Sequence, residues 1–333
     1  MTAMVIDLMK LGKEQINKGV NVDATPVVEK PVKMDVRTSK NMRMYEMAMD
    51  AFSDIAKQKG KVIDNQILNS TRLENYRYTT SNDRLYIVDR NDEKIVYGSI
   101  AYGNTKLKAT KNEMFVQFNV AQKICCPVLG KTCKNCYADK ATCVLVSGRT
   151  GELTNVGVSR TKNTVLTQFE NFVEIINGAI DYIKSSTNKK IIFRWHESGD
   201  VYTKKYFEKI KQIMDENQDV DFMMYTRVPF VLKEIKELNK KSNIMIRFSV
   251  DSTTPAGQFK YIMENDIPTF ITIDKKDENY LEMVKAFMPV GIVCNAKKIN
   301  GDKVELYKSS ELHCLKCGKC RNKNIIHLYV VIH

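Results

Sequence analysis

The sequence has no apolar run long enough to cross a membrane and no leader that resembles a signal peptide. A membrane-spanning helix needs about 18 or more consecutive apolar residues, and no apolar stretch of this chain approaches that length. At the start of the chain, Asp7 interrupts a short apolar stretch, and no small-residue cleavage site follows it. We therefore expect a cytoplasmic protein without a membrane partner.

Histidine is also scarce, with four residues in a chain of 333. Because there is no His-Glu-x-x-His motif, a zinc hydrolase that uses His196 as ligand or base is disfavoured. The composition, 43% hydrophobic and 27% charged, is that of a globular protein. The formal net charge of +13 indicates an anionic partner, and nucleic acid is the candidate.

Cysteine, in contrast, is abundant and clustered. The nine cysteines form a first group of Cys125, Cys126, Cys133, Cys136 and Cys143 and a second group of Cys294, Cys314, Cys317 and Cys320. In a reducing compartment, such clusters more often bind metal or carry redox chemistry than form disulfides. Both groups contain Cys-x-x-Cys, a spacing at which two thiolates can bind one metal or adjacent irons of a cluster. Zinc and an iron–sulfur cluster both accept four thiolates, so the spacing leaves the metal open. Cys125 and Cys143 are either further ligands or small buried side chains.

From about residue 112 the pattern predicts strands that alternate with helices. The predicted strands are 114–120, 190–196, 220–226, 243–250, 269–273 and 290–294. Charged helical stretches at 203–219 and 229–242 lie between the later strands. Strands joined by helical crossovers form parallel sheets. We therefore predict an α/β fold with a partial (β/α)6-type barrel, and an open doubly wound sheet is the alternative.

Three regions follow from this pattern. Residues 1–95 contain predicted helices at 2–18 and 39–59, a linker and the start of a β-hairpin over 84–103, and their role is unassigned. Residues 96–300 form the barrel-like domain with the first cysteine group. Residues 301–333 form a cysteine-rich metal-binding segment. It ends in the apolar stretch IIHLYVVIH, which predicts a last strand at a sheet edge or a contact with another subunit.

Polar side chains gather at the ends of three predicted strands, and in one of them, FITID, Thr272 shares a face with Asp274. In IIFRWHESGD, side-chain alternation places Arg194 and His196 on one face, and in IMIRFSVD it places Arg247 and Asp251 on one face. Active sites of parallel α/β folds lie at the carboxyl ends of the strands. We therefore predict that the four side chains of the other two strands line a cavity mouth and position a substrate that the sequence does not identify.

The first cysteine group follows the first predicted strand of the α/β region. Cys126, Cys133 and Cys136 can hold three irons of a [4Fe-4S] cluster, which leaves the fourth iron for a substrate or S-adenosylmethionine. This arrangement resembles the radical S-adenosylmethionine enzymes, which carry their cysteines after the first strand of a six-unit partial barrel (partial TIM barrel). They also place a glycine–acid motif after the second strand, where ESGD (197–200) stands here.

The resemblance implies a cofactor site and a radical reaction. Tyr137, Ser198, Gly199 and Asp200 would contact S-adenosylmethionine, with Asp200 accepting a charge-assisted hydrogen bond from the cofactor's amine. Reduction of the cluster by an electron donor would cleave the cofactor to a radical that abstracts hydrogen. The spacing Cys-x6-Cys-x2-Cys departs from the Cys-x3-Cys-x2-Cys of that superfamily. An auxiliary cluster would be held by Cys294, Cys314, Cys317 and Cys320.

A second resemblance rests on five motifs in order. They are GNTKLK (103–108), CP…C…CYA (126–138), RWHESGD (194–200), MYTRV (224–228) and CLKCGKC (314–320). Together they are similar to the phage gene product 88 domain family, over roughly residues 100–323. This implies an origin in a bacteriophage or mobile element and a place in the host cytoplasm. It supports the cysteines and strand-end residues as the functional set without naming a reaction.

Two other readings of the cysteines stay open. In a zinc-stabilised nucleic-acid-binding protein, Lys316, Lys319 and Arg321 would face phosphates from between the terminal cysteines. In a scaffold protein, structural metal would only tie loops together. Neither reading explains why polar side chains gather at strand ends.

Overall fold

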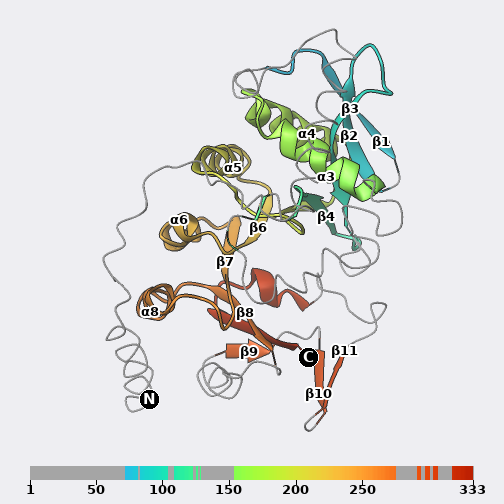
Figure 1. Cartoon of the computed structure of the whole chain (residues 1–333). Coiled ribbons are helices and arrows are strands. Elements are labelled where there is room, and N and C mark those ends of the chain that lie inside the picture. Colours follow the sequence, from blue (N-terminus) through green and yellow to red (C-terminus); the bar gives the residue numbers. More distant parts are fainter. Residues whose placement is uncertain are drawn as a thin grey trace, which may run out of the picture.

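The computed structural model describes residues 72–81, 83–103, 109–122, 125–126, 128, 154–274, 291–293, 297–300, 303–306 and 317–332. Within these ranges, ten strands form one sheet in the order β1-β2-β3-β4-β5-β6-β7-β8-β12-β9 (Figure 1). The strands are β1 (Tyr76–Ser81), β2 (Arg84–Asp89), β3 (Val96–Tyr102), β4 (Glu113–Phe118), β5 (Lys190–Trp195), β6 (Asp221–Thr226), β7 (Ile244–Val250), β8 (Thr269–Asp274), β9 (Gly291–Val293) and β12 (His327–Ile332). A separate two-stranded sheet pairs β10 (Lys297–Asn300) with β11 (Lys303–Leu306).

The sheet has an antiparallel part and a parallel part. Strands β1 to β4 pair antiparallel, and from β4 onward each neighbouring pair is parallel. Helices lie between the parallel strands: α3 (Asn155–Leu166), α4 (Phe172–Ser186), α5 (Lys204–Glu216), α6 (Pro229–Leu232), α7 (Ile235–Leu238) and α8 (Ala256–Glu264). A strand order that advances in one direction, with right-handed crossovers, places successive helices on the same face.

One hydrophobic core fills the space between these helices and the sheet. Strand β5 contributes Phe193 and Trp195 to it, both with no exposed surface. Helix α5 contributes Tyr206, Phe207 and Ile210 from one side, while its charged residues face outward. The helix begins where the Thr203 hydroxyl accepts a hydrogen bond from the Tyr206 backbone N–H, which satisfies one of the free donors of the first turn.

All six predicted strands of the α/β region are confirmed, with ends that differ by at most two residues. The predicted hairpin is confirmed as β2 and β3, and it continues through β4 into the same sheet. The partial barrel is not confirmed, because the sheet does not close on itself. From β4 to β8 the order advances in one direction, without the central reversal of a doubly wound sheet, and only β12 turns back, to lie between β8 and β9.

The predicted last strand is confirmed as β12, but its predicted place at the sheet edge was wrong. Strand β12 lies inside the sheet, parallel to β8 on one side and β9 on the other. Its unbroken apolar pattern fits that position, because an interior strand is covered on both faces. Strand β1 was not predicted. The predicted helices at 2–18 and 39–59 lie outside the described residues. None of the helices in the described ranges combines the length and apolar composition that crossing a bilayer requires.

Candidate functional site

The segments that follow β4 and β5 are tied together at the carboxyl ends of these strands. The Asn119 side-chain oxygen accepts a hydrogen bond from the backbone N–H of Ser198 at 3.2 Å. The Val120 N–H donates to the Ser198 carbonyl at 3.1 Å, and the Ser198 hydroxyl donates to the Val120 carbonyl at 3.1 Å. The Asp200 N–H donates to the Cys125 carbonyl at 2.8 Å. The start of the first cysteine group therefore lies beside the ESGD segment.

Gly199 permits this close approach. Its φ angle is +79°, and a Cβ atom there would lie 2.4 Å from Val120 Cγ2 and 2.9 Å from the Val120 carbonyl oxygen. A side chain at this position would push the two segments apart, in a backbone conformation that favours glycine.

The Asp200 carboxylate links the β5 end to the β6 end. One oxygen accepts from the Val201 N–H at 2.7 Å, and the other accepts from the Arg227 N–H at 2.9 Å. Burial raises the pKa of Asp200 to about 6, although hydrogen bonds from the Arg227 backbone and the Thr226 side chain act in the opposite direction. Both carboxylate oxygens thus have a part in fixing the loops.

A buried ion pair links the β6 end to the β7 end. Arg227 Nη1 lies 2.6 Å from Asp251 Oδ2, and the side chain of Asp251 is 2% exposed. The N–H and hydroxyl of Thr253 also donate to Asp251, at 3.0 and 2.6 Å. Burial alone would raise the pKa of Asp251, but the ion pair and these hydrogen bonds lower it to about 2. Sequence reasoning did not single out Arg227, although it lies within the MYTRV motif.

His196 packs in the core beneath the helices. Its ring stacks on Tyr206 of α5, with centroids 5.7 Å apart and an interplanar angle of 10°. Nδ1 donates to the Phe118 carbonyl at 3.0 Å, and Nε2 lies 3.4 Å from the Tyr206 hydroxyl. Burial lowers the pKa of His196 to about 4, so the imidazole is neutral at pH 7.

Arg194 has different surroundings from His196. Its guanidinium lies 5.3 Å from the centre of the Tyr225 ring, and its register partner is Gln117 of β4. The two residues were predicted on one face by alternation. However, β5 ends at Trp195, so the alternation of a strand does not extend to His196. Arg247 lies opposite Tyr225 in the sheet register and is 1% exposed.

The two adjacent cysteines at 125 and 126 have different environments. Cys125 is 1% exposed, its sulfur lies 3.5 Å from the Thr164 hydroxyl, and burial raises its pKa to about 12. Its thiol is therefore enclosed by protein, as is typical of a structural buried cysteine. Cys126 is partly exposed. Cys133, Cys136, Cys143 and Tyr137 lie outside the described residues. No group of three metal-ligating side chains converges within the described part of the chain.

The second cysteine group lies elsewhere on the sheet. Cys317 is exposed, and Cys320 packs against a small apolar cluster of Phe115, Ile192 and Met223. These three residues lie near the amino ends of β4, β5 and β6, away from the strand ends that carry Asp200 and Asp251. Cys294 and Cys314 lie outside the described residues.

Comparison with known proteins identifies the family. Residues 98–323 match the family model described as Gene product 88. The chain belongs to the gene product 88 family. The Gene 88 protein of Mycobacterium phage D29 is 27% identical over 149 residues, which cover 43% of this chain and 56% of that protein. The chain thus spans about half the length of this curated relative. No solved structure matches.

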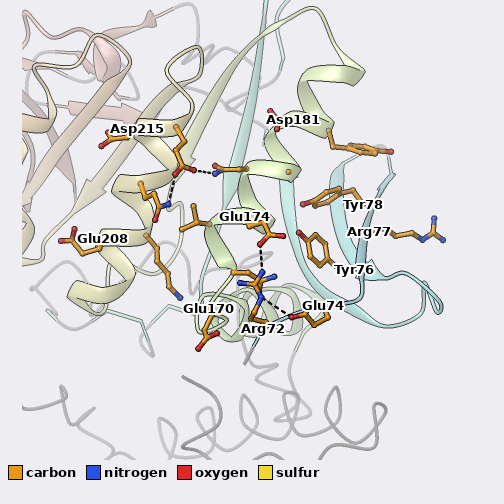
Figure 2. A pocket seen from close by; sticks show the side chains of 18 of the residues that line it. Arg72, Glu74, Tyr76, Arg77, Tyr78, Glu170, Glu174, Asp181, Glu208 and Asp215 are labelled. Carbon is orange, nitrogen blue, oxygen red and sulfur yellow. Dashed lines mark hydrogen bonds and ion pairs between the residues drawn. The ribbon is translucent and has the colours of Figure 1, made fainter. Parts of the chain in front are cut away.

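The family match supports the resemblance to phage proteins that the five motifs indicated, and it contains every one of them. An open groove of about 1670 Å³ lies between β1 and helices α4 and α5, partly outside the match. Figure 2 shows side chains that line it. Its charges largely pair with one another: Arg72, for example, contacts Glu74 and Glu174 at 3.3 and 2.9 Å. We therefore interpret the groove as a solvated surface.

Proposed function

We propose that this member of the gene product 88 family is an iron–sulfur enzyme of the radical S-adenosylmethionine type. Cys126, Cys133 and Cys136 bind a [4Fe-4S] cluster, and the second cysteine group binds an auxiliary cluster. The observation that carries the proposal is the hydrogen bond from the Asp200 N–H to the Cys125 carbonyl, at 2.8 Å. It joins the residue before Cys126 to the ESGD segment, as a cofactor shared by both would require.

The cysteine environments fit this ligand set. Cys125 is buried, and its sulfur contacts the Thr164 hydroxyl, so protein atoms enclose it. Cys126 is partly exposed, so its sulfur can reach a cluster outside the core. The choice between the two adjacent cysteines therefore follows from burial.

The remaining site residues hold the loops and present polar groups. Gly199 allows the segment after β4 to approach closely, which brings the start of the first cysteine group beside Asp200. Asp200 uses its carboxylate to hold two backbone N–H groups and the Thr226 side chain, and its remaining lone pair can accept from the cofactor's amine. When bound, the cluster supplies the electron that cleaves S-adenosylmethionine. The proposal requires an electron donor and leaves the substrate unidentified.

The first experiment is metal and sulfide analysis of protein purified without oxygen. We expect iron and acid-labile sulfide in equal amounts, about eight irons per chain if both groups hold four-iron clusters. Replacing Cys126 with Ser should remove about half of this iron. The matched control, Cys125→Ser, should keep it. The loaded protein should then cleave S-adenosylmethionine when reduced.

A colourless protein that contains only zinc would contradict the proposal. In that case, nucleic-acid binding measured at several salt concentrations would test the zinc-stabilised alternative, because phosphate contacts weaken steeply with salt. Equal loss of iron in Cys125→Ser and Cys126→Ser would contradict the assignment of the ligand.

A further inference from the structure

Arg247 holds the C-terminal cysteine turn with three of the five N–H donors of its side chain. Three backbone carbonyls of the turn accept from it: Nε donates to Cys320 at 2.9 Å, and Nη2 donates to Lys319 at 3.3 Å and Asn322 at 3.0 Å. Nη1 donates to the carbonyls of Thr269 at 3.3 Å and Ile326 at 3.1 Å. An arginine side chain has five N–H groups, so these bonds use all of them and leave none for a substrate.

The sulfur of Cys320 faces a second residue of the same sheet surface. The Tyr225 phenol lies beside the Cys320 side chain, within hydrogen-bonding reach of its sulfur. Both residues pack against the apolar cluster that contains Phe115 and Met223. Cys320 is therefore held through its carbonyl by β7 and through its sulfur by β6.

The turn itself has a defined shape. Gly318 has a φ of +65° and precedes a short 3-10 helix, Lys319–Arg321. The left-handed glycine reverses the chain between Cys317 and Cys320. An ion pair between Arg321 and Glu113 of β4, at 3.0 Å, holds the turn from its other side.

We propose that Arg247 and Tyr225 are positioning residues for the C-terminal metal site, fixing the Cys320 sulfur to the parallel sheet. This inference rests on the proposed role of Cys317 and Cys320 as metal ligands. It replaces the expectation that Arg247 binds substrate. Groups that orient a metal ligand from outside the coordination sphere change metal affinity about 10- to 100-fold when they are mutated, and hydrogen bonds to the sulfur tune the electronic properties of the metal.

Cobalt(II) binding to the full chain tests the proposal. The background carries Cys126→Ser, Cys133→Ser and Cys136→Ser, so that thiolate-to-cobalt absorption reports the second group alone. Arg247→Lys keeps the charge but loses the five-donor fork, and we expect about tenfold weaker binding or more. The matched control is Arg84→Lys, which changes an arginine of β2 that pairs with the exposed Asp83 and belongs to the antiparallel part of the sheet. Its binding should stay within about twofold of the background.

Tyr225→Phe gives a readout that a purely structural role would not change. Loss of the hydrogen bond raises the energy of the sulfur lone pairs, so the thiolate-to-cobalt absorption should move to longer wavelength. Unchanged affinity in Arg247→Lys, or an unchanged absorption maximum in Tyr225→Phe, would overturn the proposal. If Arg247→Lys fails to fold by circular dichroism, the Tyr225→Phe spectrum decides.

Failure of this inference can be told apart from failure of the proposed function. If the background chain binds no cobalt through thiolates, the C-terminal metal site and its positioning residues are overturned. The iron and sulfide of the first group are then measured in a chain that carries Cys317→Ser and Cys320→Ser. Iron in that chain would still support the proposed enzyme. Absence of iron would contradict both the proposed function and the C-terminal metal site.

Discussion

Asp200 and His196 make opposite contributions to the pH dependence of the unfolding free energy. Replacing either residue should therefore reveal the contribution of the other. The pKa of Asp200 lies at about 6, above the 3.8 of an exposed aspartate. The folded protein therefore holds this proton more tightly than the unfolded chain, and stability falls as the pH rises from about 4 to 6. The pKa difference of about 2 corresponds to at most about 3 kcal/mol, at about 1.4 kcal/mol per pH unit.

His196 acts in the other direction over nearly the same range. Its pKa lies at about 4, below the ordinary 6.5. Here the unfolded chain binds the proton more tightly, so stability rises as the pH increases from about 4 to 6.5. The pKa difference of about 2.5 again corresponds to about 3 kcal/mol. In the unmodified protein, the contributions of the two groups nearly cancel.

The assay is equilibrium unfolding in urea between pH 4 and 7, under reducing conditions. The chain has a single tryptophan, Trp195, which is fully buried beside His196 and reports unfolding by its fluorescence. Relative to the unmodified protein, Asp200→Asn should gain up to about 3 kcal/mol of unfolding free energy as the pH rises from 4 to 6.5. His196→Phe should lose a similar amount over that range. Identical pH profiles for the three proteins would refute the buried environments from which these shifts are derived.

Two further substitutions test the joints at the strand ends. Gly199→Ala should lower the unfolding free energy by about 1–3 kcal/mol. The control is Gly257→Ala in helix α8, where an added Cβ meets nothing within 4 Å, and thermal denaturation should find it neutral or stabilising. Equal effects of the two substitutions would argue against the close approach at Gly199. Asp251→Asn removes one member of the buried pair with Arg227 and should lower the unfolding free energy by about 3–5 kcal/mol in urea titrations. The control, Glu264→Gln on the exposed face of α8, should change it by less than about 1 kcal/mol. A small effect of Asp251→Asn would show that the pair contributes little.

The sequence predicts the parallel strands well because their signal is local. Phe193 and Trp195 alternate with polar residues within one short stretch, and Thr203 marks a helix start immediately after it. Sheet closure depends on curvature summed over many strands, which no local pattern encodes. The position of β12 depends on its pairing with strands far along the chain.

The roles of the site residues were harder to predict because they depend on contacts with residues far away in the sequence. Arg247 was recognised as a polar residue on a strand, but four of its five carbonyl partners lie more than 70 positions away, in the terminal turn and just before β12. Cys125 and Cys126 are identical neighbours in sequence, and only burial distinguishes them. His196 follows the last residue of its strand, where alternation no longer holds.

The place of β12 between β8 and β9 has a consequence for synthesis on the ribosome. Strand β9 is made before β12, yet β12 is its only partner among the described strands. Until residues 327–332 have left the exit tunnel, β8 and β9 each lack the neighbour that separates them. Direct pairing of β8 with β9 is then a competing misfolded arrangement, which the nascent chain must avoid or reverse. Arg247 contacts carbonyls on both β8 and the segment before β12, so it favours the native insertion once the last strand arrives.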